Sequence, residues 1–475
     1  MGSINMKKLI STVLLVSAMA PVAFAQEDLI KRLSLLEDRI GELEANQSLN
    51  IFKFGGLLET RYDNVVAKQT DPSTSAIDSK VDYLRLRASF DMSADVSKNI
   101  KVYSRYTMTK FSNIYYTQSV GSGTAPVTSS DLSAAKGENG AQVYVEKFYA
   151  DATVPDTGVV FSFGRLPISD GPPFHFPNGR PRTGTYPGLL YNGQLDGVAL
   201  TYNKPVADGT FSVRGVHTPK TVLTSSAGKL TGAKGVISNP TDNAGNSSRT
   251  LRDLDTLMLE FNSNKVSFAD NISIILQAFS VSLTMAGSQL SVPYQSTSLT
   301  GSGDVDFKIE AQALYFGIEN IAHIGLDFSA THLMSTVTND GCITFGGAPC
   351  TDAYISASSA IAGFGATTRG EKIKGSSTLL TARYRIISPT YFGVEYLMGG
   401  KNVYVFDQNS DNVVAFYDTP GTGTHAYILH KFTNDLGLRF GYMQQDYKST
   451  TFGLGPSKDT DRKVTTYYAN LRLDF

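Results

Sequence analysis

The 475-residue sequence predicts an all-β transmembrane protein, a closed antiparallel up-and-down β-barrel preceded by one short helix. Three observations predict this fold. Segments of about 9–11 residues alternate apolar and polar side chains, as tilted membrane-spanning strands do. The connections between these segments alternate between long and short. Glycine (43), tyrosine (24) and phenylalanine (26) are abundant, whereas charged residues make up only 18% of the chain.

The composition also excludes several classes of protein. Lysine and arginine (42) nearly balance aspartate and glutamate (43), which argues against a nucleic-acid-binding protein. No apolar run after the N-terminus reaches the roughly 18 residues that a transmembrane helix needs. The chain contains no phosphate-binding glycine loop, nucleophile elbow or zinc-protease motif, so we expect neither an enzyme nor a bound cofactor or metal.

The N-terminus predicts export. Lys7 and Lys8 precede a short apolar run that ends at Ala23-Phe24-Ala25. This order of basic, apolar and small residues is typical of a secretory signal peptide, so we assign residues 1–25 to one, with cleavage after Ala25. A retained membrane anchor is the alternative.

Two cysteines, Cys342 and Cys350, lie close together in a segment rich in glycine. Because export places the chain in an oxidising compartment, we expect them to form a disulfide within one loop. A metal site is the alternative, but no histidine stands near these cysteines in the sequence.

Residues 26–48 predict the one convincing helix of the chain. Its apolar residues are spaced four and three apart, which is the stripe of a coiled-coil core: Leu29, Leu33, Leu36, Ile40 and Leu43. Arg32 and Arg39 occupy positions from which they would pair with Glu37 and Glu44 of a neighbouring helix. An amphipathic helix packed on its own domain is the alternative, and the stripe does not decide between a dimer and a trimer.

The remainder, residues 49–475, contains sixteen alternating segments, although fourteen or eighteen strands stay open as alternatives. Their predicted centres are Leu57, Leu86, Tyr103, Ala150, Phe161, Leu200, Val213, Leu257, Leu276, Ala311, Leu326, Ala382, Val394, Ile428, Phe440 and Leu471. The long connections, such as 111–141, 167–194 and 399–423, would all lie at one end of the sheet. A soluble β-sandwich has no reason for this asymmetry, whereas a transmembrane barrel has long outer loops and short periplasmic turns.

The last segment carries a family resemblance. Tyr467, Ala469, Leu471, Leu473 and Phe475 share one face, and the chain ends on that phenylalanine. This strand resembles the C-terminal strand of bacterial outer-membrane barrels, in which the terminal aromatic residue is read by the barrel-assembly machinery. The mature chain as a whole resembles a Gram-negative porin. Tryptophan is absent, so tyrosine and phenylalanine would form the interfacial girdle here.

Alternation then predicts which side chains face the lumen. Apolar residues should face lipid and polar residues should face a water-filled interior, because a dry interior would bury unpaired charges. On the strand near Ala311 this places Ile309 and Ala311 outside and Lys308 and Glu310 inside. A barrel of sixteen strands is wide enough for an aqueous channel.

The same alternation predicts a basic wall on three consecutive strands. It consists of Arg61, Arg85, Arg87, Lys101 and Arg105, with Arg383, Arg385 and Arg439 added from later strands. The predicted inward acids are Glu59, Asp151, Glu260, Asp306, Glu310, Asp327 and Glu395. From the arginines we expect a mild preference for anions.

The connection 167–194 differs from the others because it is dense in proline and glycine. Proline fixes the φ angle and stiffens a loop. The porin resemblance implies that this third outer loop folds into the barrel and narrows it, with Asp170, Arg180 and Arg182 near the edge of the constriction. A rigid surface loop is the alternative.

These observations predict a trimeric outer-membrane porin for ions and small hydrophilic solutes. Its long loops would be extracellular, its coiled coil periplasmic, and its surroundings lipid and lipopolysaccharide. An outer-membrane enzyme is disfavoured because no catalytic pair can be assembled. A surface adhesin or receptor that acts through the long loops is the remaining alternative.

Overall fold

The structure, a computed structural model, divides into two units, Met1–Lys53 and Phe54–Phe475. It describes residues 35, 37, 52–69, 77–112, 116–120, 123–127, 142–167, 170–192, 195–223, 230–231, 236–237, 249–264, 266–286, 301–302, 304–339, 344–345, 370–407, 416–449 and 459–475. Leu35 and Glu37 are helical and exposed. The signal peptide, the coiled-coil core residues and the two cysteines lie outside the described residues, so these assignments stay predictions.

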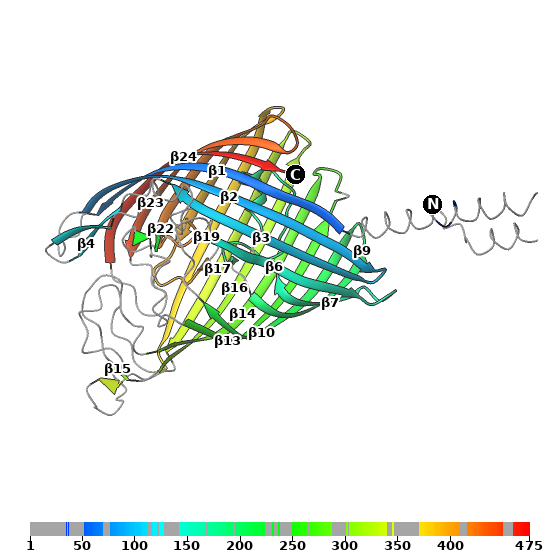
Figure 1. Ribbon diagram of the computed structural model, residues 1–475, viewed down its shortest axis with the longest axis horizontal. Coiled ribbons are helices and arrows are strands. Elements are labelled where there is room, and N and C mark those ends of the chain that lie inside the picture. The colour runs from blue at the N-terminus through cyan, green and yellow to red at the C-terminus, as the bar shows by residue number, and fades with distance from the viewer. Residues whose placement is uncertain are drawn as a thin grey trace, which may run out of the picture. The chain divides into compact units, whose positions relative to one another are not determined.

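Sixteen antiparallel strands close into one barrel (Figure 1). In ring order they are β1 (Phe52–Gln69), β2 (Ile77–Ser97), β3 (Ile100–Ser112), β6 (Gln142–Thr153), β7 (Val159–Leu166), β9 (Leu195–Val206), β10 (Gly209–Leu223), β13 (Arg249–Ser263), β14 (Asn271–Ala286), β16 (Asp304–Ile321), β17 (Leu326–Asn339), β19 (Lys372–Ile387), β20 (Thr390–Gly399), β22 (Gly421–Lys431), β23 (Leu436–Ser449) and β24 (Asp459–Asp474). Each predicted centre falls within one of these strands, which confirms the count of sixteen.

The first and last strands join to close the ring. β1 pairs with β24 from Leu57 opposite Asp474 to Gln69 opposite Arg462. The ladder continues to the last residue, because the Gly56 N–H donates to the Phe475 carbonyl (2.7 Å) and the Phe475 N–H donates to the Gly56 carbonyl (3.0 Å). The C-terminal phenylalanine is therefore part of the seam.

The remaining elements lie in the long connections. They are the hairpins β4 (Tyr116–Val120) with β5 (Gly123–Val127) and β11 (Leu230–Thr231) with β12 (Val236–Ile237), the pair β15 (Gly301–Ser302) with β18 (Thr344–Phe345), the helix α3 (His175–Asn178), and β8 (Tyr191–Asn192), which pairs in parallel with β21 (Phe406–Asp407). No helix within the described ranges is both long and apolar enough to cross a membrane.

The outside of the barrel is apolar, as alternation predicts. Along β24, Tyr467 and Leu471 are exposed, whereas Tyr468 and Asn470, which lie between them in the sequence, are buried. Tyr467 packs beside Tyr442 of β23 with ring centroids 5.2 Å apart. An exposed apolar face on a closed sheet is the surface that a bilayer solvates, because every backbone group is already paired within the ring.

The interior is less polar than predicted in the sector around β16. On β16 the assignment was wrong: Ile309, Ala311 and Ala313 are buried inside, and Lys308 and Glu310 form an ion pair (2.8 Å) on the exposed outer side. Inward positions of the neighbouring strands are also apolar and buried, namely Met258, Ile275, Leu333, Leu379 and Leu397. This sector of the inner wall is therefore richer in apolar side chains than predicted.

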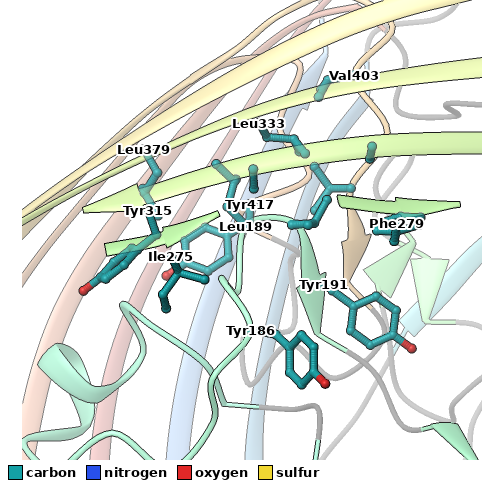
Figure 2. Packing of buried hydrophobic residues seen from close by; sticks show 14 of the residues in the cluster. Tyr186, Leu189, Tyr191, Ile275, Phe279, Tyr315, Leu333, Leu379, Val403 and Tyr417 are labelled. Carbon is teal, nitrogen blue, oxygen red and sulfur yellow. The ribbon is translucent and has the colours of Figure 1, made fainter. Parts of the chain in front are cut away.

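Two loop segments supply the apolar partners of this sector. Tyr186, Leu189 and Tyr191 come from the connection between β7 and β9, and Val403 and Tyr417 come from the connection between β20 and β22. Figure 2 shows these side chains packed among Ile275, Tyr315, Leu333 and Leu379 of the wall. The parallel pair β8–β21 joins the two segments through their backbones. Because the loops bring their own apolar surface, an apolar inward face is favourable here.

We predict that Ile309→Ala lowers the free energy of unfolding by about 2–5 kcal/mol, because it leaves a cavity in this apolar sector. Ile309 is 0% exposed. Chemical denaturation of the folded barrel in detergent micelles, followed by tyrosine fluorescence, measures the change.

Leu314→Ala on the same strand is the matched control. Leu314 is 50% exposed on the outer face, so its truncation creates no internal cavity and should cost on the order of 1 kcal/mol. If the Leu314 variant lost as much stability as the Ile309 variant, the inside-outside assignment of β16 would be wrong.

Candidate functional site

The segment 170–192 folds back on itself inside the barrel because of its glycines. Gly179 ends α3 in the left-handed region (φ 63°), and a Cβ there would lie 2.4 Å from Leu429 of the wall. A Cβ on Gly171 would lie 1.5 Å from the carbonyl oxygen of Tyr186. Glycine is required where two backbones approach this closely, so these two positions allow both the turn and the contact between its arms.

Apolar side chains anchor both arms of the segment. Phe174, Leu189 and Leu190 are buried, and the ring of Phe174 lies 5.1 Å from that of Tyr417 in the second loop. The predicted surface-loop alternative is therefore wrong for residues 170–192, which are folded into the barrel. We call residues 174–185, the part between these anchors, the crossbar.

Basic side chains of the wall hold the backbone of the crossbar. Arg383 of β19 donates from Nη1 to the carbonyl of Phe176 (3.1 Å), and its guanidinium lies 5.0 Å from the Phe176 ring centroid. The same arginine is fixed by Asp327 of β17, whose Oδ2 lies 2.6 Å from Nη2. Lys431 of β22 donates from Nζ to the carbonyl of Gly179 (2.8 Å).

Arginines of the crossbar in turn reach two opposite parts of the ring. Arg180 forms an ion pair with Asp474 of β24 and donates to the carbonyl of Asp435 (3.0 Å). Arg182 forms an ion pair with Glu260 of β13. β13 is eighth and β24 sixteenth in ring order, so the crossbar spans the interior between opposite walls. Arg180 and Arg182, which the sequence predicts at the edge of a constriction, thus lie on the part of the loop that crosses the interior; their role in a constriction stays a prediction.

Asp170 lies elsewhere in the segment than predicted. Its carbonyl accepts from the Gly184 N–H (3.3 Å) at the base of the loop, and its φ angle is 61°. Its charge acts on Arg105 and Lys147 of the β3–β6 wall. It therefore belongs between the loop base and that wall, and not at the tip of the crossbar.

The predicted basic wall is a network of ion pairs. Carboxylates accompany each of its four arginines: Asp63 with Arg61 (2.8 Å), Glu59 with Arg85 (2.5 Å), Glu146 with Arg87 (3.1 Å), and Asp91 with Arg105 (2.7 Å). Glu146 also lies 3.6 Å from Arg105. The sequence analysis missed Glu146 because a β-bulge between Arg105 and Tyr106 shifts the inward positions of β6.

Two further predicted residues lie apart from this network. Lys101 is largely exposed at the start of β3 and pairs with Asp95 (3.4 Å). Arg385 is exposed near the end of β19, where its backbone N–H donates to Gly325 (2.9 Å). Arg439 of β23, by contrast, donates to the side chain of Asn178 in the crossbar (3.1 Å).

A second buried network holds the other loop and was not predicted. His425 of β22 bonds Glu395 of β20 through Nδ1 (2.6 Å) and the hydroxyl of Tyr468 through Nε2 (2.7 Å). Tyr417 of the loop donates its hydroxyl to Glu395 (3.2 Å). The alternating polar residues of the three strands indicated that these side chains point inward. Alternation does not identify their partner Tyr417, because that residue lies in a loop.

One titratable group lies inside the crossbar itself. His175 is buried, and its Nε2 lies 3.7 Å from Glu319 of β16. Burial lowers the pKa of His175, and nearby Arg383 and Arg182 act in the same direction, whereas Glu319 acts against them. Burial therefore favours the neutral form of the imidazole.

Within the described ranges, no group of three or more histidine, cysteine, aspartate or glutamate side chains is arranged to hold a metal ion. The clusters above are ion pairs and hydrogen bonds between neighbouring strands and loops. In each pair the opposite charges compensate one another.

Several solved outer-membrane barrels resemble the fold. OmpT of Vibrio cholerae in its trimer form is 12% identical with a TM-score of 0.41, covering 89% of this chain and 99% of that one. OmpF of Salmonella typhi in complex with daunomycin is 10% identical with a TM-score of 0.43, covering 89% and 97%. An anion-selective porin from Comamonas acidovorans is 9% identical with a TM-score of 0.43, covering 89% and 99%.

No curated protein matches the sequence. The strand pairing itself therefore carries the assignment of a porin-like sixteen-stranded barrel. A family model described as "Protein of unknown function (DUF3373)" matches residues 82–457, which run from within β2 to beyond the end of β23. Since this match covers well over half of the sequence, the chain belongs to the DUF3373 family.

Proposed function

We propose that the protein is an outer-membrane porin that lets ions and small hydrophilic solutes diffuse through its barrel. The observation that carries the proposal is the crossbar, a loop folded into a closed barrel and held at both walls by ion pairs. An apolar outside and a polar sector inside support it, because a charged inner wall is favourable only where it is paired or wet.

The path would run beside the ion-pair network. Crossbar contacts fall on β13, β19, β22, β23 and β24, whereas β1, β2, β3 and β6 carry the network. Asp91 (29%), Lys147 (24%) and Arg105 (19%) keep partly exposed side chains there. Loop 167–194 would thus narrow the lumen to a sector instead of ringing it.

Location and assembly are part of the same proposal. The chain would be exported by residues 1–25, inserted through its terminal Phe475 by the barrel-assembly machinery, and oriented with its long loops extracellular. Residues 26–48 would form a periplasmic coiled coil in a homotrimer, and Cys342 and Cys350 would form a loop disulfide. The adhesin alternative depends on loops that lie largely outside the described residues, and it stays a prediction.

We predict that the double variant Arg180→Ala/Arg182→Ala raises single-channel conductance at least about twofold, because it removes the two long side chains and the ion pairs by which the crossbar reaches opposite walls. Planar-bilayer recording of the purified barrel measures this. Arg165→Ala is the matched control, since Arg165 pairs with Asp196 of the neighbouring strand (2.8 Å) and does not hold the crossbar.

Two outcomes would count against the proposal. If the wild-type barrel gave no conductance steps, the protein would not be a porin. If the double variant conducted as the wild type does, the crossbar would not be the constriction.

Ion selectivity should follow single members of the network. We predict that Glu146→Gln shifts the reversal potential in a salt gradient towards anions, because it leaves Arg87 and Arg105 in excess. Arg105→Gln should shift it towards cations by leaving Asp91 in excess. Equal shifts of one sign in both variants would show that local lumen charge does not set selectivity.

Crossbar stability should depend on pH through His175. Burial lowers the pKa of His175 in the folded chain, so protonation favours the unfolded state. Its contribution to stability is complete above the unfolded pKa of about 6.5 and is lost as the pH falls below that value. The thermal unfolding midpoint in micelles should therefore drop more steeply below pH 6.5 in the wild type than in His175→Asn.

The histidine variant separates this effect from carboxylate titration, which both proteins share. Identical pH profiles for the two proteins would show that His175 is not the group responsible.

A further inference from the structure

A small cavity lies between the crossbar and the short-turn ends of β22, β23 and β24. Its volume is about 20 Å³, and its polar lining includes Asn178, Arg180, Lys431, Arg439, Arg472 and Asp474. A space above roughly 10–15 Å³ holds one water-sized particle. The cavity is therefore large enough for one monatomic ion and too small for a phosphate or a carboxylate ligand.

The charges around the cavity favour an anion. Four cationic side chains line it against two carboxylates, Asp435 and Asp474. Asp474 already accepts from both Arg180 and Arg472. The lining thus carries a formal excess of two positive charges, in a space that opens to solvent beside the exposed Asp435. Glu59 also interacts with Arg439 and Arg472 and offsets part of this excess.

Arg439 offers a donor that nothing uses within the described part of the chain. Its side chain is 6% exposed and its Nη1 donates to Asn178 Oδ1 (3.1 Å), but its Nε has no hydrogen-bond partner there. A buried guanidinium N–H without an acceptor is uncommon, because losing its hydration costs about 1–3 kcal/mol or more. A particle that accepts from Nε would remove this cost.

We propose that this cavity binds one halide ion, such as chloride, against Arg439 Nε. The ion would lie among side chains that hold the crossbar, because Lys431 bonds Gly179 and Arg180 pairs with Asp474. Its binding would reinforce the attachment of the crossbar tip to β22–β24. This site goes beyond the proposed channel, since its ion is a fixed structural component and does not permeate.

A water molecule is the competing occupant. Asn470, opposite Arg439 in the β23–β24 register, has an Oδ1 that lacks a partner among the described residues. One water could accept from Arg439 Nε and donate to that oxygen, whereas a halide could only accept. The experiment must therefore distinguish an ion from a water.

Bromide-soaked crystals of the full-length protein provide that distinction. We expect an anomalous difference peak in contact with Arg439 Nε in the wild type and in the control Arg165→Gln, and none in Arg439→Gln. A wild-type map with density but no anomalous signal at this position would identify a water and overturn the proposal. A peak that persists in Arg439→Gln would overturn it as well.

Thermal unfolding gives a second readout that does not need the variant crystals. Replacing chloride by gluconate, which is too large for the cavity, should lower the unfolding midpoint of the wild type and of Arg165→Gln at constant ionic strength. Lys431→Met, which removes one cation from the lining, should show less than half of that shift. An equal shift in all three proteins would show a general salt effect and count against a bound ion.

Discussion

Closure of the sheet is the constraint on which the rest of the molecule depends. In a bilayer, an unpaired backbone N–H or C=O costs several kcal/mol, so a strand sheet is stable there only when its first and last strands pair. Here β1 and β24 pair over thirteen positions, and the terminal Phe475 extends the seam to Gly56. Because the ring fixes sixteen strands, the lumen has a set width, and the loops can only fill part of it.

The inward side chains of the barrel are stabilised differently in two sectors of the ring. On β14 and β16 the inward face is largely apolar, and loop residues such as Leu189 and Val403 pack against this sector. On β1–β3 and β6 the wall is charged, and each arginine has a carboxylate within reach.

Sequence reasoning recovered what depends on local pattern. The period of two located all sixteen strands. The proline and glycine content of 167–194 singled out that loop, and the porin resemblance implied that it folds inward. Alternation gave the wrong inward face on β16. Ile309 and Leu314 lie on opposite faces of this strand and both are apolar, so the pattern alone does not show which face is inside. Contact with a loop that is distant in the sequence decides it. The bulge that brings Glu146 inside, and the contact between Tyr417 and Glu395, are likewise set by tertiary partners.

The way in which the crossbar is attached follows from these constraints. Its backbone carbonyls at Phe176 and Gly179 accept from Arg383 and Lys431, so long cationic side chains of the wall supply donors that a loop without secondary structure lacks. These bonds place positively charged side chains in a confined space, where each charge is favourable only if a carboxylate or water lies close to it. Asp327 balances Arg383, but the cations at the tip of the crossbar outnumber their acids. At the tip, Asp474 alone pairs with both Arg180 and Arg472, so this end of the attachment depends on one shared carboxylate.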